Sequence, residues 1–306
     1  MIAAVLVATL VQSRFIISLL NYSLVYVILA LGLQLIVGVT GQLSLGHAAF
    51  YGIGAYASAI ATTRFGMPWV VGILLAMAFA TLGSLLMSLT VRTRGIYFAV
   101  ATLAFGIIIH LVFVNWVPVT RGTMGILGLE RRLWGQWRID SPQGYFLFLA
   151  FVVCAVYVFL ARLTDSRFGR ALKAIRENEL AAQSIGIDVT RYKIKSILIG
   201  GATAGLAGSM MAHLTRMVTP EPFGWWKSIV LLIMIVAGGL GSMPGAAVGA
   251  FVLTLLSEYF RGYAEYSMLA YGLIIVFFMI YLPEGLAGLW HIIIQKVRWG
   301  GRRAVW

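Results

Sequence analysis

The sequence is short of charge, and of acidic residues above all. Among 306 residues, 10 are Asp or Glu and 23 are Lys or Arg; 11% of the chain is charged and 61% is hydrophobic. Soluble domains average about 25% charged and roughly 45–50% apolar residues. This composition excludes an ordinary soluble domain. Together with a mean hydropathy of +0.94, it predicts a protein that crosses a membrane several times.

The chain also lacks the motifs that mark common catalytic and cofactor sites. It has no GxxxxGK[ST] sequence, so it carries no phosphate-binding loop for ATP. No HExxH, CxxC or GxSxG motif occurs, which leaves no candidate zinc, dithiol or serine-hydrolase centre. We therefore expect no catalytic residue, no metal site and no cofactor in this chain.

The long uncharged runs contain no carboxylate, the residue type that usually marks proton- or ion-coupled carriers. Their histidines are His47, His110 and His213, and a lone membrane histidine more often packs than relays protons. A single cysteine, Cys154, excludes an intrachain disulfide and is expected to face lipid or another helix. The energy source for any transport is therefore expected outside this chain.

Seven uncharged runs divide the sequence. A membrane-spanning helix needs about 20 apolar residues, so the 49 residues of 15–63 are expected to hold two spans. Counting the apolar N-terminal fragment, we predict an all-α, single-domain transmembrane helix bundle of about nine or ten membrane elements. Gly201 with Gly205, and Gly245 with Gly249, form GxxxG steps that predict close helix packing. The runs are 15–63, 67–91, 95–120, 144–161, 196–215, 228–257 and 267–283.

Two of these runs are interrupted by glycine-rich stretches, GQLSLGH at 41–47 and GGLGSMPG at 238–245. A helix broken at membrane depth leaves backbone groups that need polar partners, which is tolerated only beside protein or a water-filled path. We predict that both breaks border a translocation path, with Gln42, Ser44 and His47 supplying polar partners. Two alternatives stay open: 238–245 is a turn outside the membrane, or His47 has a packing role. The predicted path residues are Gln42, Ser44, Gly46, His47, Gly238, Gly239, Gly241 and Ser242.

The charge that the sequence does have is concentrated in one segment, 162–195. It holds eight of the 23 basic residues and four of the 10 acidic ones. Basic residues in short loops beside spans mark the cytoplasmic side, so this segment and the basic tail after 283 are predicted to be cytoplasmic. The formal net charge of +13 is therefore assigned to topology and to contact with anionic lipid, not to nucleic-acid binding.

Within 162–195 the pattern predicts two short helices. Leu172 and Ile175 lie three residues apart and share a face of the first, 167–178. Asn178 is expected to cap the second, 179–185, whose first residue is an acid that suits a helix N-terminus.

The end of the second helix indicates how it is used. Gly186 fits the left-handed residue that follows a helix. Ala181, Ala182 and Ile185 give this helix a small apolar face between charged flanks. That combination predicts a short helix that docks into a groove on another protein. The alternative is a solvated loop held by its charge alone.

These residues resemble those of a known family. AAQSIG, from Ala181 to Gly186, is similar to the EAA loop of ABC importer permeases. The surrounding GRALKAIRENELAAQSIGIDVTRYKIK resembles that loop in branched-chain amino acid importers. LGLQLIVGVTGQLSLGHAAFYGIGAY (31–56) and RTRGIYFAVATLAFG (92–106) are similar to earlier blocks of the family. VTPEPFGWWKSIVLLIMIVAGGLGS and EYSMLAYGLIIVFFMIYLPEGL resemble its C-terminal third. The likeness covers nearly the whole chain and is to the LivM type of permease subunit.

The resemblance implies the membrane-spanning permease subunit of an ABC importer in the bacterial inner membrane, carrying branched-chain or related hydrophobic amino acids. It implies three kinds of partner: a second, homologous permease subunit, two ATPase subunits that bind ATP and magnesium, and an extracytoplasmic binding protein. One alternative is the same permease type for urea, short amides or another small solute. A second, from a different class, is a secondary carrier or channel working alone. The residues assigned to ATPase coupling are Arg170, Arg176, Glu179, Ala181, Ala182 and Gly186.

Overall fold

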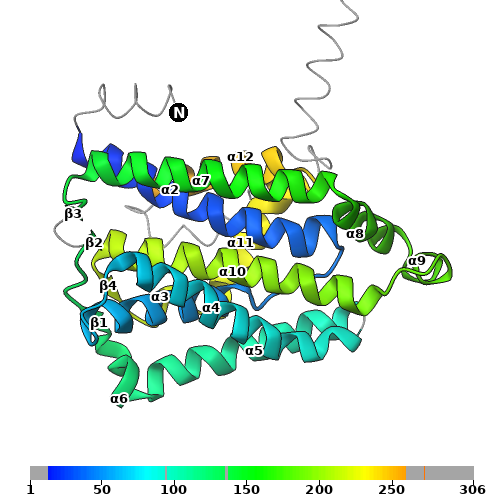
Figure 1. The fold of residues 1–306 in the computed structure, drawn as a ribbon, viewed down its shortest axis with the longest axis horizontal. Helices are drawn as coiled ribbons and strands as arrows, with labels where there is room; N and C mark the ends of the chain where they lie inside the picture. The colour runs from blue at the N-terminus through cyan, green and yellow to red at the C-terminus, as the bar shows by residue number, and fades with distance from the viewer. Residues whose placement is uncertain (1–12, 94, 135–136, 260–271, 273–306) are drawn as a thin grey trace, which may run out of the picture.

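The computed structural model of the chain describes residues 13–93, 95–134, 137–259 and 272 (Figure 1). The N-terminal fragment, almost all of the run 267–283 and the basic tail lie outside the described residues. The helices are α2 (Arg14–Gln34), α3 (His47–Thr63), α4 (Trp69–Ser88), α5 (Ile96–Asn115), α6 (Val117–Thr120), α7 (Pro142–Asp165), α8 (Arg167–Glu177), α9 (Glu179–Ser184), α10 (Val189–Thr215), α11 (Trp225–Gly238) and α12 (Met243–Tyr259). Shorter turns are the π-helical η1 (Leu35–Val39) and the 3₁₀ turns η2 (Leu89–Arg92), η3 (Gly122–Met124) and η4 (Glu221–Phe223). The strands are β1 (Ile126–Leu127), β2 (Arg132–Trp134), β3 (Trp137–Arg138) and β4 (Met217–Val218).

Within the described residues, five helices are long and apolar enough to cross a membrane: Phe15–Val39, Trp69–Val91, Ile96–Asn115, Pro142–Asp165 and Val189–Thr215. The shorter apolar helices α11 and α12, together with the 17-residue α3, bring the candidate membrane elements in the described part of the chain to eight. The predicted all-α, multi-pass bundle is therefore confirmed. The one or two remaining elements of the predicted nine or ten fall on the N-terminal fragment and on 267–283, outside the described residues.

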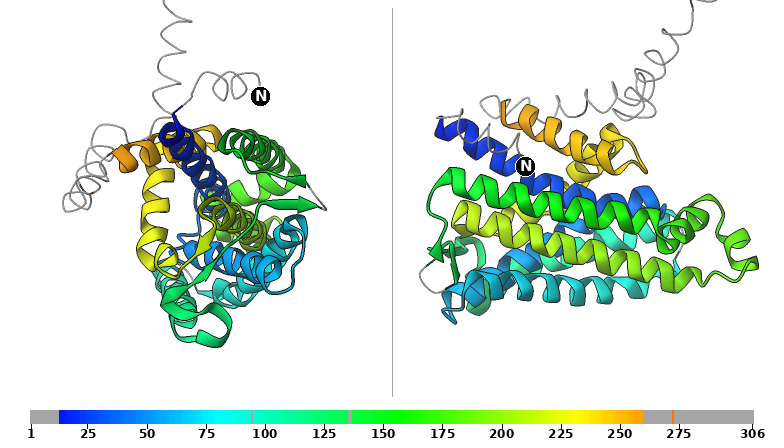
Figure 2. Two further views of the ribbon diagram at one scale, coloured as in Figure 1. Left: turned by 90° about the vertical axis from the view of Figure 1, so that its left-hand side faces the viewer. Right: turned by 45° about the horizontal axis from the view of Figure 1, so that its top comes forward.

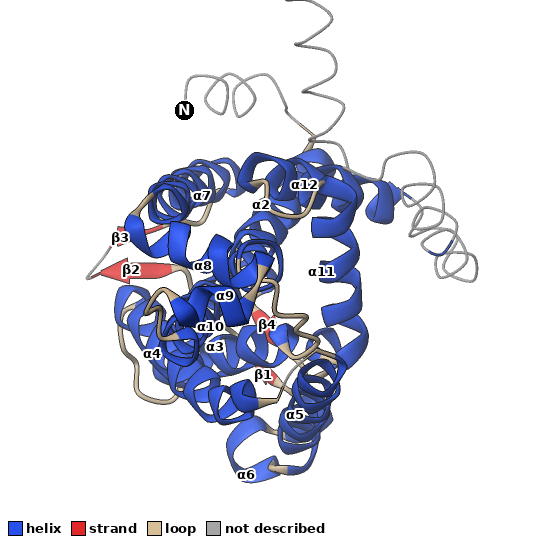
Figure 3. Cartoon of the chain, turned by 90° about the vertical axis from the view of Figure 1, so that its right-hand side faces the viewer, coloured by secondary structure: helices blue, strands red, loops and turns tan. Residues whose placement is uncertain are grey.

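The bundle has two distinct ends (Figure 1). At one, here called the strand end, β1 pairs antiparallel with β4 and β2 pairs with β3. At the other, the loop end, the chain leaves α7 through α8 and α9 before it re-enters the bundle as α10 (Figures 1 and 3). The predicted cytoplasmic segment 162–195 therefore forms one end of the molecule.

Helix α10 lies at the centre and packs against α2, α3 and α4. Its glycines allow this close approach. A Cβ on Gly205 would lie 2.5 Å from both the Ala76 oxygen and the Ala80 side chain, and one on Gly201 would lie 2.5 Å from Ser84. The GxxxG step of Gly201 and Gly205 thus brings α10 onto α4, as expected where dispersion forces drive helix association.

Two helices begin inside the bundle rather than at its ends. Helix α3 starts at the buried His47 after an irregular segment, 40–46, that enters from the loop end. Helix α11 follows 216–224, which enters from the strand end (Figure 2). The first turns of the two helices meet, because Ser228 Oγ accepts a hydrogen bond from the Ala48 amide at 3.0 Å. Helix α3 then runs to the strand end and α11 to the loop end, so the two broken helices point in opposite directions.

A buried cluster of rings closes the strand end. Arg131 donates to the His213 carbonyl at 2.8 Å and lies 4.2 Å over the Tyr145 ring. Trp69 stacks between Tyr145 and His213, with ring centroids 5.7 and 4.6 Å away. Burial lowers the pKa of Arg131 from its usual value, and the cation caps the C-terminal carbonyls of α10. His213 therefore packs, as the sequence predicts for a lone membrane histidine.

Candidate functional site

Helix α8 begins the candidate coupling site. Ser166 caps it, because Ser166 Oγ accepts from the Phe168 amide at 3.2 Å. Leu172 and Ile175 are both buried, which confirms their predicted common face. Gly169 fits where a larger residue would collide with the Thr164 backbone. The helix is therefore fixed to the end of α7 at its start and to the bundle along one face.

Helix α9 has the predicted caps. Asn178 Oδ1 accepts from the amides of Leu180 and Ala181 at 3.0 and 3.1 Å. Gly186 follows the helix with φ of +85° and nothing within 4 Å of the position of a Cβ. An L residue would be strained there although space is available. The local signals in the sequence were thus sufficient to place this helix.

The predicted apolar face of α9 is divided in the structure. Ala182 is 2% exposed and packs with Ile175 and Val189. Ala181 is exposed, and Ile185, which lies beyond the helix end, is 74% exposed. The expectation of one shared face was wrong because neighbouring helical positions point about 100° apart and the helix ends before Ile185. The large apolar side chains exposed here are Leu180, on α9, and Ile185, directly after its end.

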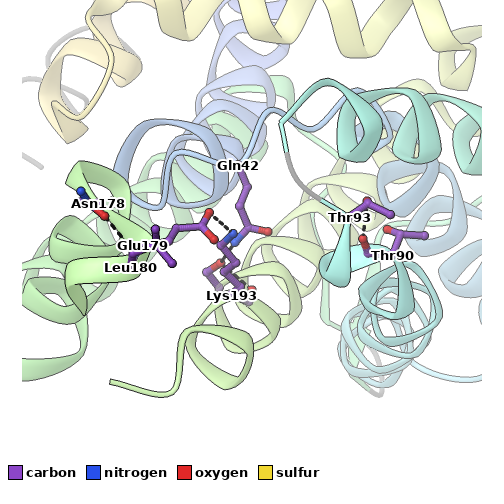
Figure 4. A network of polar contacts seen from close by, with 8 residues as sticks. Gln42, Thr90, Thr93, Asn178, Glu179, Leu180 and Lys193 are labelled. Atoms are coloured by element: carbon purple, nitrogen blue, oxygen red, sulfur yellow. Dashed lines mark hydrogen bonds and ion pairs between the residues drawn. The ribbon is translucent and has the colours of Figure 1, made fainter. Parts of the chain in front are cut away.

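A buried ion pair joins α9 to α10. Lys193 Nζ, on a side chain only 8% exposed, pairs with Glu179, and Gln42 extends toward the same pair from the segment after η1 (Figure 4). Gln42 Nε2 donates to Ser196 Oγ at 3.5 Å, one turn from Lys193. Removing either partner of such a pair leaves an uncompensated charge, so the pair holds α9 against α10. The Gln42 hydrogen bond attaches the irregular segment 40–46 to the same part of α10.

Arg176 connects α8 with both predicted helix breaks. Its Nη1 donates to the carbonyl oxygen of Gly38, in η1. A Cβ on Gly41 would lie 3.0 Å from Arg176 Cγ, and one on Gly241 would lie 2.7 Å from Nη1. Because Gly41 and Gly241 have no side chains, the arginine fits between the start of the first break and the turn of the second.

The second break is a tight turn at the loop end. Gly239 and Gly241 have φ of +115° and +89°, and Gln34 Nε2 donates to the oxygens of Gly239 and Ser242 at 3.0 and 3.2 Å. Leu240 at its tip is exposed. The structure thus shows a turn between the two short helices α11 and α12, and this turn contacts the first break through Arg176. Its depth in the membrane stays a prediction.

The first break obtains its polar partners from other helices. Leu45 N donates to Thr102 Oγ1 at 3.0 Å, and Ser228 accepts from α3 as described above. Among the described residues, Gln42 bonds to the Ser196 side chain and Ser44 Oγ is buried without a partner. The role expected for Gln42, Ser44 and His47 at this break stays a prediction. His47 is fully buried, with its ring edge-on to Phe50 at 6.1 Å.

The structure divides the predicted site residues into two groups. Arg176, Glu179 and Gln42 lie at the loop end with the turn Gly239–Ser242. Ser44, Gly46 and His47 lie deeper, beside α5, where Gly46 packs on the Thr102 backbone. Arg170 is exposed and donates to the Asp165 carbonyl at 3.0 Å. Gly238 is buried against Gly245 of α12.

Several residues that hold the site were not predicted. The Thr102 and Ser228 hydroxyls accept hydrogen bonds from amides that lie 57 and 180 positions away in the sequence. No local sequence pattern therefore predicts this role. Gln34 is fully buried within an apolar run, which is a usable signal because a buried amide needs partners. Lys227 is the only lysine between 195 and 296 and borders a long uncharged run. An isolated charge at the edge of a membrane helix is a second signal of a functional position.

Comparison with known proteins gives this arrangement its context. The family model for the permease component of branched-chain amino acid transport systems matches residues 15–282. The chain belongs to this family. The permease is 34% identical over 299 residues to the high-affinity branched-chain amino acid transport system permease protein LivM of Salmonella typhimurium, covering 90% of this chain and 70% of the relative. The Escherichia coli K12 LivM protein gives the same identity and coverage.

A second, more distant relative is LivH. The permease is 25% identical over 285 residues to the Salmonella typhimurium LivH protein, covering 86% of this chain and 91% of the relative. No solved structure matches. The family is one of transport permeases and not of enzymes, and the apolar helices fit a multi-pass membrane protein.

Proposed function

We propose that this permease is the membrane-spanning subunit of an ABC importer that carries branched-chain amino acids, and that its loop end faces the cytoplasm and docks an ATPase. The observation that carries the proposal is the placement of Arg176. This residue belongs to the exposed loop-end helix α8, yet its guanidinium binds the Gly38 carbonyl and lies against Gly241. A displacement of α8 therefore acts directly on both helix breaks.

The docking surface is the outward side of α9. Leu180 and Ile185 are 65% and 74% exposed, and the adjoining helices carry the basic residues of 162–195. Two apolar side chains on a short, capped helix fit a groove of a partner. The ion pair of Glu179 with the buried Lys193 transmits a push on α9 into α10 instead of letting the loop bend alone.

The path for substrate runs beside the two broken helices. Half-helices that begin inside a membrane protein supply backbone groups for polar parts of a ligand, and their surroundings supply its shielding. The surroundings here are apolar and small-residue rich, which suits an aliphatic amino acid side chain. The first turns of α3 and α11 are joined by the hydrogen bond from the Ala48 amide to Ser228, so a movement of one helix start displaces the other.

The proposed assembly contains a second permease subunit, for which LivH-like relatives are the model, and two ATPases that bind ATP and magnesium. An extracytoplasmic binding protein delivers substrate at the strand end, and the complex lies in the bacterial inner membrane. ATP-driven closure of the ATPases moves the docked α9 and α8 and switches access to the path.

The test is uptake of labelled leucine by proteoliposomes that contain the permease with its partner subunits. Uptake is expected only with ATP on the ATPase side and loaded binding protein on the other, and the permease alone is expected to hydrolyse no ATP. Leucine uptake by the permease alone under an ion gradient would contradict the proposal, as would ATP turnover by the isolated chain.

A further inference from the structure

A cavity of about 680 Å³ opens between α2, α10, α11 and α12 in the half of the bundle nearer the strand end. It is of the size that small-molecule sites usually have, about 300–1,000 Å³. Its floor is apolar: Met211, Val230 and Met234 line it and are buried. It is separate from the contacts of Arg176 at the loop end.

Lys227 brings a positive charge to this apolar cavity. Its Nζ donates to the Tyr26 hydroxyl at 2.9 Å and lies 5.0 Å from the Tyr26 ring centre. An ammonium group has three donors, and within the described part of the chain Tyr26 is the one group that accepts from Lys227 Nζ. A charged side chain on a membrane helix is costly and is by default a functional candidate, so the remaining donors point to a ligand with negative charge.

The other lining groups define the rest of that ligand. Glu221, on the η4 turn, is exposed and lines the same cavity, where it can accept from an ammonium group. The buried methionines and valine offer contact to an aliphatic chain. One carboxylate acceptor, one basic side chain and an apolar floor together match an amino acid zwitterion with a hydrophobic side chain.

We propose that this cavity is a binding site for an aliphatic amino acid, in which Lys227 binds the carboxylate, Glu221 the ammonium group and the apolar floor the side chain. The inference rests on the proposed function and deepens it, because it places a substrate site within this subunit. Substrate released at the strand end reaches this cavity before the two breaks.

Direct binding tests the site without the binding protein. Saturation-transfer NMR would measure L-leucine on the complete transporter in phosphatidylcholine nanodiscs, for the natural chain, Lys227→Met, Lys227→Arg and Glu221→Gln. A charge-assisted hydrogen bond contributes about 1.5–3 kcal/mol, so Lys227→Met is expected to weaken binding about tenfold or more. Lys227→Arg is expected to restore most of it, and leucinamide, which lacks the carboxylate, is expected to bind the natural chain weakly.

The control is Arg138→Met, which removes one positive charge from the same end of the bundle, where Arg138 forms an exposed pair with Glu130. This variant is expected to bind leucine as the natural chain does. Unchanged leucine binding by Lys227→Met would overturn the inference. So would a Lys227→Met complex that keeps leucine binding but no longer retains phosphatidylglycerol on purification, because the cavity would then hold a lipid headgroup.

Leucine uptake separates the two proposals. If the natural transporter shows no ATP-dependent leucine uptake, the proposed function fails. If it shows uptake that Lys227→Met leaves unchanged, the proposed function stands and the substrate site in this cavity is wrong.

Discussion

At the scale of residues, the important polar side chains are those that hydrogen-bond to backbone groups left unpaired where a helix is interrupted. Arg176, Thr102 and Ser228 each meet a backbone group that a continuous helix would have satisfied. An unsatisfied buried group costs about 1–3 kcal/mol, which is a large share of the free energy that separates two conformations of a transporter. These contacts can therefore stabilise one state of the path over another.

Arg176→Met should uncouple transport from ATP hydrolysis. The variant keeps the aliphatic packing on Gly41 but leaves the Gly38 carbonyl without its donor, at a cost of about 1–3 kcal/mol. Leucine uptake is expected to fall about tenfold, and ATP hydrolysis should no longer respond to loaded binding protein. Uptake and hydrolysis measured on the same proteoliposomes test this, with the exposed Arg138→Met as control. Full stimulation by the binding protein in Arg176→Met would show that the contact does not couple.

Thr102→Val and Ser228→Ala should each destabilise the start of α3. Both remove the acceptor of a buried amide, so the thermal unfolding midpoint in detergent should fall and leucine uptake should decrease. The matched control is Thr81→Val, because the Thr81 hydroxyl donates to the Met77 carbonyl of its own helix, at 2.7 Å. Equal midpoints for Thr102→Val and Thr81→Val would mean that the Leu45 amide finds another partner.

At the scale of elements, close helix contact depends on glycine at particular positions. Gly205→Ala and Gly106→Ala make the same chemical change in helices α10 and α5, with a similar gain in helix propensity. The new Cβ would lie 2.5 Å from Ala76 and Ala80 in the first case, but 3.6 Å from its nearest neighbour in the second. Overpacking costs about 1–3 kcal/mol, so Gly205→Ala should lower the unfolding midpoint while Gly106→Ala should not. A reversed order would contradict the packing described for α10.

The sequence was most informative about elements whose signals are local. The caps of α9 at Asn178 and Gly186, and the buried face of α8, follow from residues within one turn of each other. The direction of Ala182 and Ile185 could not be predicted in the same way, because it depends on Val189 and on where the helix ends. The partners of the breaks come from helices far along the chain, so only the need for partners was predictable, and not Thr102, Ser228 or Gln34.

At the scale of the whole molecule, two broken helices of opposite direction meet in the interior, while one end carries α8 and α9 and the other carries the strands. In the proposed topology, these two ends lie on opposite sides of the membrane. In a Cys154→Ala background, Met124→Cys at the strand end, where the side chain is 82% exposed, should react with an impermeant thiol reagent in right-side-out vesicles. Leu240→Cys should react only in inside-out vesicles. Labelling of both from one side would contradict the topology.

Cross-linking of α9 to the ATPase tests the central claim most directly. Single cysteines would replace Leu180, Ile185 or the buried Ala182 in the Cys154→Ala permease, each assembled with an ATPase that carries a cysteine in its docking groove. The exposed Leu180 and Ile185 positions should form disulfide-linked products whose yield changes between the ATP-free and ATP-bound states, and Ala182 should form little. If the complex is assembled and neither exposed position cross-links in any nucleotide state, α9 is not the docking element.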